Sequence, residues 1–454
     1  MKVTVAGYNI DTETLDEMRR HCSSDVMTPE TLSAAYARIS RSPDTAEVLR
    51  QAARKNVEKA RKSNNNIVFE MGHSSIAEHA VFNMDIENVS RYLLEEIQRH
   101  RLASYTEKSQ RYVKVGKDFY FPQEWEEFRE KLSELHTLSS LLYHELVDSG
   151  IPTEDARYYL PLTVTTQLGM TLNARSAEHM ILTLGASPLA EARELSSLLH
   201  EKIKSITPSL IRYVKPDEYH RRTWGRGLLR PSSFSGQDYR EQTFIGSIRK
   251  VYSTPDMDSM ILGACLSRIS GESIFKSLDI IKNYTDEKKK QFFSEIIEGA
   301  DLHDKMPHEF EHGVFTWELV LSAAAFAQLK RHRISTVSHV FLDPSLGFTH
   351  PVTVTGKLLE KAKNTVIESE KLFSEFLERY PESAPASYAL LSGNRRRVLW
   401  TLNLREYYHF SRLREDEHAQ WDIRQIAKLM TEEVRKTAPV CSGFLGGKSE
   451  LAEK

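Results

Sequence analysis

The sequence has few cysteines and no long apolar run. Cys22, Cys265 and Cys441 are three in number and far apart, so neither a disulfide framework nor a paired-thiol zinc site is indicated. The longest apolar stretch, residues 319–329, includes two polar residues and is shorter than the roughly 20 residues that cross a bilayer. The first residues lack the apolar segment of a signal peptide. We therefore expect a cytoplasmic protein that does not enter a membrane.

The chain also lacks a strong excess of either charge. Its 61 basic and 63 acidic side chains leave a formal net charge of -2, which gives no overall attraction to nucleic acid or to anionic lipid. The basic tract at residues 220–231 contains one tryptophan and is predicted to be a solvated linker.

With 454 residues the chain is too long for one ordinary core, and two domains are expected.

The sequence repeats itself once. Four pairs of similar segments occur in the same order, at offsets of 230, 233, 232 and 230 positions. The pairs are residues 38–40 and 268–270 (Arg-Ile-Ser), 78–79 and 311–312 (Glu-His), 99–101 and 331–333 (Arg-His-Arg), and 172–179 and 402–409 (LNARSAEH and LNLREYYH). A stretch containing proline, glycine and serine, residues 215–239, separates the halves. We place the boundary at Gly236, which gives repeats 1–236 and 237–454.

Each repeat is predicted to be helix-rich with a small sheet. Apolar residues at positions 86, 89, 93 and 97 have helical spacing and lead into Arg99, and the matching segment 317–333 is predicted to be a more apolar helix. Segments 3–10 and 111–121 have the alternation of strands. The expected fold class is α+β, as two tandem repeats that form a pseudo-dimer.

One segment has an unusual density of polar groups. Residues 99–112 hold three arginines, a histidine, a carboxylate and several hydroxyls. Arginine donates to phosphate in a planar, multidentate way, and a nearby carboxylate and hydroxyl can hold a sugar or base. The segment therefore predicts a nucleotide or a phosphate-bearing cofactor. An isolated Arg-His-Arg would be better explained as a basic helix end, which is favourable on its own.

The spacing Arg-His-Arg, seven residues, then Ser, followed by Gln-Arg-Tyr, resembles the motif of the flavin-dependent thymidylate synthases. The resemblance continues through residues 72–91, 156–179 and 403–424. It implies active sites between the subunits of a homotetramer, with FAD, dUMP, methylenetetrahydrofolate and NADPH as ligands. It also implies that reduced flavin supplies a hydride and that no cysteine nucleophile is needed.

The resemblance assigns a role to residues of both repeats. The residues it assigns to FAD are His79, Arg99, His100, Arg101, Glu107, Asn173, Arg175, His179, Asn403, Arg405 and His409. Those it assigns to dUMP are Glu107, Ser109, Gln110, Arg111, Gln328, Arg331 and Arg414. Ser109 and Arg414 are the expected catalytic residues, and Arg414 would face the uracil and stabilise its ionised form.

The first repeat departs from the family pattern in one half of the site. Leu184 occupies the position of the uracil-facing arginine, and Glu96 replaces a glutamine. The second repeat keeps both family residues, as Arg414 and Gln328.

The second repeat departs in the other half. His339 stands where the first repeat has Glu107, and Phe341 stands where it has Ser109. Each repeat thus keeps what the other lacks, which predicts one composite pocket per chain. Two chains are then expected to form a homodimer that resembles the family's tetramer.

One gap and two alternatives stay open. A second dUMP-binding arginine of the family is Arg157 in the first repeat but Ser387 in the second, where residues 395–397, all arginine, could substitute. Ser387 and Glu96 favour a flavin- or nucleotide-binding paralogue without synthase activity. The changes also fit a flavin enzyme that acts on another pyrimidine nucleotide.

Residues 301–312 contain several histidines and acidic residues but no metal-binding motif, and we expect no metal.

Overall fold

The structure is a computed structural model that describes residues 12–21, 27–39, 42–116, 118–225, 247–301, 303–339, 341–381 and 383–449. No helix in these ranges is long and apolar enough to cross a membrane. The boundary predicted at Gly236 and the strand predicted at residues 3–10 lie outside the described residues.

The chain divides into two compact units that do not coincide with the two repeats. Unit 1 comprises residues 1–87, 102–107 and 167–226, and unit 2 comprises residues 88–101, 108–166 and 227–454. Unit 2 therefore contains the whole second repeat together with two segments of the first. One of those segments carries the first Arg-His-Arg motif and the other carries Ser109.

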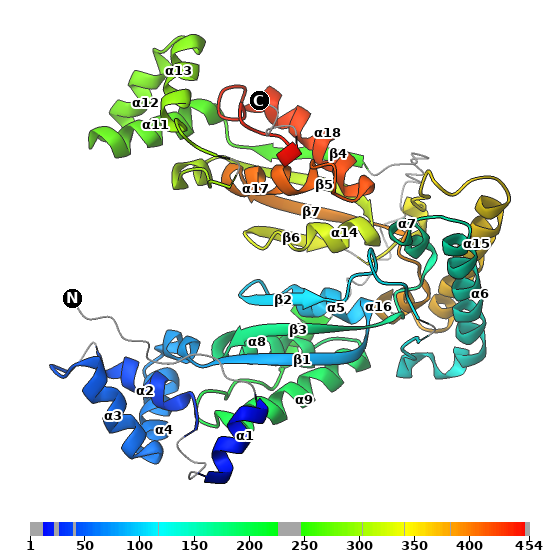
Figure 1. Ribbon diagram of the computed structural model, residues 1–454, viewed down its shortest axis with the longest axis horizontal. Helices are drawn as coiled ribbons and strands as arrows, with labels where there is room; N and C mark the ends of the chain where they lie inside the picture. Colours follow the sequence, from blue (N-terminus) through cyan, green and yellow to red (C-terminus); the bar gives the residue numbers. More distant parts are fainter. Residues whose placement is uncertain are drawn as a thin grey trace. The chain divides into compact units, whose positions relative to one another are not determined.

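Unit 1 is built mainly of helices around a three-stranded sheet (Figure 1). Its elements are α1 Thr12–His21, α2 Glu30–Ile39, α3 Ala46–Lys55, α4 Val57–Asn65, the π-helix η2 Asn66–Glu70, the 3-10 helix η3 Ser74–His79, β1 Val81–Ser90, β2 Ala103–Glu107, β3 Thr165–Asn173, α8 Ala174–Gly185, α9 Ala190–Ile206, α10 Glu218–His220 and the π-helix η6 Arg221–Gly225. A small alanine-rich core joins α2, α3 and α4. The last two elements lie within the segment predicted to be a linker.

Unit 2 holds the four-stranded sheet and the larger core. Its elements are α5 Arg91–Gln98, η4 Gln123–Phe128, α6 Arg129–Asp148, α7 Thr153–Ala156, η5 Arg157–Tyr159, β4 Ser247–Ser253, α11 Met257–Ser270, α12 Ile274–Lys282, α13 Asp286–Ile296, η7 His308–His312, β5 Val314–Ser322, α14 Ala323–Leu329, β6 Ser335–His339, η8 Pro344–Leu346, α15 Gly356–Arg379, α16 Ser383–Ala386, η9 Ser387–Ala389, β7 Arg395–Asn403, α17 Leu404–Arg414 and α18 Trp421–Thr437. Helices α17 and α18 pack along the sheet and bury its apolar side chains (Figure 1).

Three strands of each sheet have the same order, which confirms the tandem repeat. The first sheet has the order β1-β3-β2, and the second has the order β4-β5-β7-β6, in which β5, β7 and β6 are the counterparts of β1, β3 and β2. The registers also agree, because Ala103 pairs with Leu172 in the first sheet and Ser335 pairs with Leu402 in the second. The expected α+β fold class is confirmed.

Within unit 2, segments of the two repeats meet with local two-fold symmetry. The backbone N–H of Leu162 donates to the carbonyl of Leu390 at 3.0 Å, and the N–H of Ser392 donates to the carbonyl of Leu160 at 2.9 Å. Leu160 and Leu390 are equivalent positions, as are Leu162 and Ser392. Helices α6 and α15, which are also equivalent, pack against each other. The halves therefore pair as a pseudo-dimer at this contact.

Two predicted helices begin later than expected. Ile86 and Val89 lie in β1, and helix α5 begins at Arg91 because the Ser90 hydroxyl caps it by accepting from the N–H of Leu93 at 2.9 Å. In the second repeat β5 ends at Ser322, whose hydroxyl caps α14 in the same way. A serine N-cap separates strand from helix in both repeats. The apolar spacing spanned both elements and hid the boundary.

The strand predicted at residues 111–121 is wrong. This segment forms turns and a single bridge between Phe119 and Val164. Its first apolar residues, Tyr112 and Val113, are exposed, so the alternation does not correspond to a buried face. The backbone is held instead by polar contacts of Arg111 that are described below.

Candidate active site

The turn after β2 places Ser109 and Arg111 in unit 2. The Ser109 hydroxyl accepts from the backbone N–H of Arg111 at 3.2 Å. The Arg111 guanidinium donates to Glu154 at 2.8 Å and to the backbone carbonyl of His418 at 3.0 Å. Since His418 belongs to the second repeat, this arginine connects the two repeats directly.

Arg157 lies beside Arg111 in the short helix η5. It is 3% exposed, and its Nε donates to the carbonyl of Glu154 at 3.1 Å. Burial lowers the pKa of Arg157, and the positive charges of Arg91 and Arg111 lower it further. A buried guanidinium among like charges is costly without an anion, so this arrangement suits a negatively charged ligand.

The second repeat contributes Gln328, Arg331 and Arg414 to the same unit. The Arg414 guanidinium donates to the backbone carbonyl of Gln328 at 3.1 Å and to its side-chain oxygen at 3.5 Å. Burial lowers the pKa of Arg414 to about 10, and the charges of Arg331 and Arg111 contribute to this shift. Arg414 therefore stays charged at neutral pH, and it lies within electrostatic reach of the first repeat's Arg111.

His332, the histidine of the second Arg-His-Arg motif, is buried behind Arg414. Its Nε2 accepts from the Arg414 Nε at 3.1 Å, and its Nδ1 lies 3.3 Å from the Glu406 carboxylate. Burial and the neighbouring Arg414 charge hold the pKa of His332 well below its usual range. The imidazole is therefore neutral at physiological pH.

Two buried side-chain groups at this site have no hydrogen-bond partner among the described residues. They are the Nε2 amide of Gln110 and one terminal nitrogen of Arg157. Both residues are more than nine-tenths buried. Buried donors are normally satisfied, so two orphaned donors beside Arg111 indicate that a ligand with acceptor atoms belongs there.

Six of the seven residues that the resemblance assigns to dUMP lie in unit 2. Ser109, Gln110, Arg111, Gln328, Arg331 and Arg414 all lie in unit 2, whereas Glu107 ends β2 in unit 1. Sequence reasoning did not include Arg91, Glu154, His332 or Glu406 in the nucleotide site. Each of these residues enters through a contact between segments distant in sequence, for which no local motif exists.

The counterparts of the residues above form a second set of positions, which we call the degenerate site and which includes Glu96 and His339. A buried ion pair between the two repeats lies beside these two residues. The Arg396 guanidinium makes two contacts with the Glu95 carboxylate, at 2.7 and 3.2 Å, and both side chains are at most 5% exposed. Arg396 also lies over the Phe326 ring at 4.6 Å and 3.3 Å from the Nδ1 of His339.

Its two neighbours in the sequence also have protein partners. Arg395 donates to Thr349, and Arg397 pairs with Glu318. The three arginines that could have replaced the arginine missing at Ser387 are therefore engaged within the protein.

The residues assigned to FAD are divided between the units. His79, Glu107, Asn173, Arg175 and His179 lie in unit 1, and Arg99, His100, Arg101, Asn403, Arg405 and His409 lie in unit 2.

Several of the FAD-assigned residues also have structural roles. Asn173 and Asn403 cap helices α8 and α17, and Arg405 donates to the carbonyl of Met306 and pairs with Glu311. Burial lowers the pKa of His179, with a smaller effect from His220. The side chain of Arg99 is 41% exposed.

A group with metal-ligand side chains occurs at His332, Glu406 and His409, whose ligand atoms lie within 4.8 Å of one another. The charges of Arg405 and Arg333 act on Glu406, and those of Arg414 and Arg331 act on His332. A divalent cation placed among four guanidiniums would be repelled, so the group does not fit a metal site. Within residues 301–312, where no metal is expected, the Nδ1 of His308 lies 2.9 Å from the Glu311 carboxylate.

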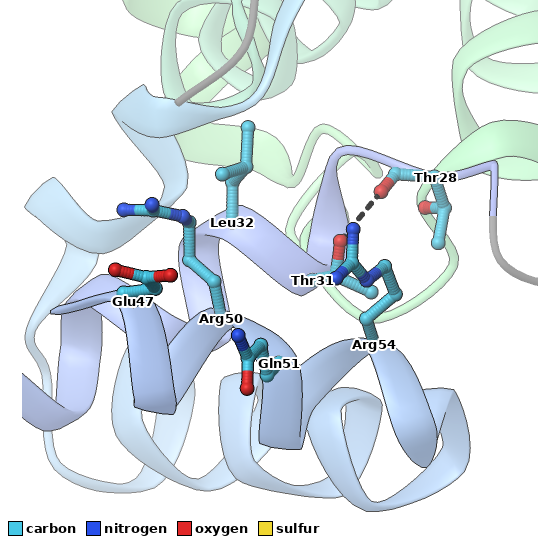
Figure 2. A pocket seen from close by; sticks show the side chains of 7 residues that line it. All are labelled: Thr28, Thr31, Leu32, Glu47, Arg50, Gln51 and Arg54. Carbon is cyan, nitrogen blue, oxygen red and sulfur yellow. Dashed lines mark hydrogen bonds between the residues drawn. The ribbon is translucent and has the colours of Figure 1, made fainter. Parts of the chain in front are cut away.

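A separate polar hollow of about 410 Å³ lies in unit 1 between α2 and α3. Figure 2 shows its lining, which combines the carboxylate of Glu47 with the guanidiniums of Arg50 and Arg54. These residues belong to none of the motifs described above. None of the residues assigned to dUMP or to FAD lines this hollow.

Comparisons with known proteins agree with the repeat and the motif. The family model described as "Thymidylate synthase complementing protein" matches residues 24–209 and again residues 251–440. A flavin-dependent thymidylate synthase of Saccharolobus solfataricus is 33% identical over 151 residues, which are 32% of this chain and 58% of that protein. One from Geobacter sulfurreducens is 34% identical over 157 residues, which are 33% of this chain and 67% of that protein.

A third relative is similar over nearly the whole chain. The UPF0159 protein Ta1429 of Thermoplasma acidophilum is 24% identical over an alignment of 488 positions, covering 91% of this chain and 94% of that protein. A solved structure, the UMP/dUMP methylase PolB from Streptomyces cacaoi bound with 5-Br dUMP, matches 43% of this chain and 93% of its own at 17% identity, with a TM-score of 0.36. Because the family model matches both repeats and most of the chain, the protein belongs to the thymidylate synthase complementing protein family, as a tandem two-repeat member.

Proposed function

We propose that the protein is a flavin-dependent thymidylate synthase with one composite site per chain. It would convert dUMP to dTMP with methylenetetrahydrofolate as the one-carbon donor, NADPH as the reductant and FAD as the hydride carrier. The proposal is supported by family membership and by the names of the relatives. This chain spans 58% of the length of the Saccharolobus solfataricus protein.

The observation that carries the proposal is the cationic site built from both repeats. The charge of Arg111 acts on Arg157 in the first repeat and on Arg414 in the second, and the charge of Arg331 also acts on Arg414. A nucleotide monophosphate supplies the dianion that such a site requires, and its base and sugar supply the acceptors for the orphaned donor of Gln110.

The proposed reaction requires three contributions from these side chains. Arg111 and Arg157 would bind the anionic part of dUMP and hold it in place. Arg414 would stabilise negative charge that develops on the uracil as it reacts, from a position fixed before the reaction. Ser109, at the turn beside Arg111, would contact the base or the sugar as the family motif implies.

The exposed donors of the Arg-His-Arg segment fit a flavin dinucleotide. Arg99 follows directly after helix α5, and 41% of its side chain is exposed. Guanidinium groups suit a pyrophosphate, which is the anionic part of FAD. When bound, FAD supplies the redox chemistry of the reaction.

The described cysteines support a route without a thiol nucleophile. Cys265 and Cys441 are both fully buried. Burial raises the pKa of Cys265 to about 12 and holds the pKa of Cys441 well above its usual value. Neither thiol is ionised at neutral pH, so neither is activated for attack on the uracil.

The buried ion pair supports one site per chain. In the alignment of the two repeats, Glu95 corresponds to Ala327 and Arg396 corresponds to Thr166. The composite site thus has two small side chains where the degenerate site has two large charged ones that neutralise each other. Two chains would then give a homodimer with two sites, where the family's tetramer has four.

Release of tritium from C5-labelled dUMP tests the proposed reaction. We expect the purified, FAD-loaded protein to release tritium only when methylenetetrahydrofolate and NADPH are present, in step with dTMP formation. Bound FAD without release would favour the paralogue that lacks synthase activity. Release with a different pyrimidine nucleotide, and none with dUMP, would favour the other alternative.

Matched substitutions at equivalent positions test the composite site. Ser109→Ala and Arg414→Ala are expected to lower turnover at least about 100-fold, as is typical when a group that stabilises the reacting state is removed. The counterparts are Phe341→Leu and Leu184→Met, which keep an apolar side chain at each position. Both variants should stay within about threefold of the wild type. Equal effects at all four positions would contradict the composite site.

A further inference from the structure

We infer that Glu406, acting through His332, positions Arg414 for the reaction. The inference rests on the proposed role of Arg414 at the uracil. The three side chains form a continuous chain of contacts, 3.3 Å from Glu406 to the His332 Nδ1 and 3.1 Å from the His332 Nε2 to the Arg414 Nε. Glu406 is a positioning residue in this scheme, because it reaches the substrate only through its neighbours.

The contacts determine which imidazole nitrogen carries the proton. The Nε of an arginine can only donate, so the Nε2 of His332 must be the acceptor. Since the imidazole is neutral, its single N–H is at Nδ1 and donates to the Glu406 carboxylate. The other tautomer would set two donors against each other at Arg414 and two acceptors against each other at Glu406.

This tautomer fixes the plane of the Arg414 guanidinium. Its Nε is held by His332, and its two terminal nitrogens each donate to Gln328. Three of the five N–H bonds of an arginine are therefore used within the protein, and two remain for a ligand. Because a guanidinium is planar and rigid, fixing one edge aims the remaining N–H bonds.

Comparison of the repeats shows that Glu406 and Arg414 occur together. The first repeat has Ser176 at the position of Glu406 and Leu184 at the position of Arg414, although it keeps the histidine as His100. His332 is buried, whereas His100 is partly exposed. The second repeat therefore has both the carboxylate and the arginine at these two positions, and the first repeat has neither of them there.

Kinetics of two Glu406 variants separate positioning from general stability. Glu406→Gln keeps a side-chain oxygen that can accept from Nδ1, and its kcat should stay within about threefold of the wild type. Glu406→Leu removes the acceptor, and kcat per bound FAD should fall about 10- to 100-fold while the KM for dUMP changes much less, as expected for misplacement of a reacting group. The control is Ser176→Ala at the equivalent position, for which no change is expected.

Three kinetic outcomes would overturn the inference. They are an equal loss of kcat in both Glu406 variants, an unchanged kcat in Glu406→Leu, and a loss that disappears when kcat is expressed per folded, FAD-bound chain. If the wild-type protein does not methylate dUMP, the proposed function fails instead.

The tautomer can be measured without any activity. In protein labelled with ¹⁵N-histidine, with His332 assigned through a His332→Gln variant, we expect a protonated Nδ1 and an unprotonated Nε2 at neutral pH. Glu406→Leu should shift this distribution, whereas Glu406→Gln should preserve it. A proton on Nε2 in the wild type, or the same tautomer in all three proteins, would contradict the positioning role even if dUMP is methylated.

Discussion

Replacing Glu95 with alanine should destabilise unit 2 far more than its position on a short helix suggests. The variant leaves the Arg396 guanidinium buried without its partner, because both side chains of the pair are at most 5% exposed. Breaking a buried ion pair by removing one member typically costs about 3 to 5 kcal/mol of unfolding free energy.

The next residue along α5 provides a matched control. Glu96 pairs with Arg99 at 3.1 Å, but these side chains are 18% and 41% exposed. A solvent-exposed pair of this kind contributes less than about 1 kcal/mol. Glu96→Ala is therefore expected to change the unfolding free energy by less than that amount.

The double variant Glu95→Ala/Arg396→Met separates the ion pair from simple packing. Removing both charges leaves no unpaired ion, so the double variant should recover most of the stability lost in Glu95→Ala. An arginine-to-methionine change also keeps an extended side chain over the Phe326 ring.

Urea unfolding followed by tryptophan fluorescence is a suitable assay. Four of the five tryptophans lie in unit 2, at positions 125, 317, 400 and 421. The signal therefore reports mainly on the unit that contains the ion pair. Equal midpoints for Glu95→Ala and Glu96→Ala, or a double variant less stable than Glu95→Ala, would refute the buried pair as the element that closes the degenerate site.

Two further predictions concern buried basic groups. Burial lowers the pKa of His136 to about 4, so its stabilising contribution is present above its unfolded pKa of about 6.5 and is lost as the pH falls toward 4. Melting experiments should show a loss approaching 3 kcal/mol over this range from His136, and His136→Gln should reduce the slope. Arg157→Gln should weaken dUMP binding about 10- to 100-fold in calorimetry, because a charged hydrogen bond is lost. The same variant should not lower the melting temperature, because it removes one of several like charges; unchanged affinity would contradict its role.

The sequence allowed the duplication to be inferred, whereas the division of the site between the repeats stays a prediction. Four matching segments at nearly constant offsets were sufficient, because a repeated fold keeps the residues that build its strands and caps at equivalent positions. The strand orders and registers of the two sheets agree with that inference.

Local boundaries were harder to predict for a physical reason. Ile86 and Val89 have the spacing of a helix, yet they lie in a strand that passes directly into α5. A strand and a helix that share one buried side give a mixed periodicity, and only the capping Ser90 marks the change. Single serines are too common for that signal to be decisive.

The contacts of the site residues with distant parts of the chain could not be predicted from sequence motifs. Glu95 meets Arg396 across 301 positions, and His332 meets Glu406 across 74. These pairs form only when distant segments pack together. The local motifs that contain His332 and Glu406 do not indicate which residue each of them will contact. The same holds for Arg91, whose charge reaches Arg157 through the fold.

The most direct test of the central claim is the number of dUMP molecules bound per chain. Equilibrium dialysis of the FAD-saturated protein with labelled dUMP should give one molecule per chain, with binding lost in Arg414→Ala and kept in Leu184→Met. Two molecules per chain would contradict closure of the degenerate site by Glu95 and Arg396. One molecule per two chains would contradict a complete site within each chain.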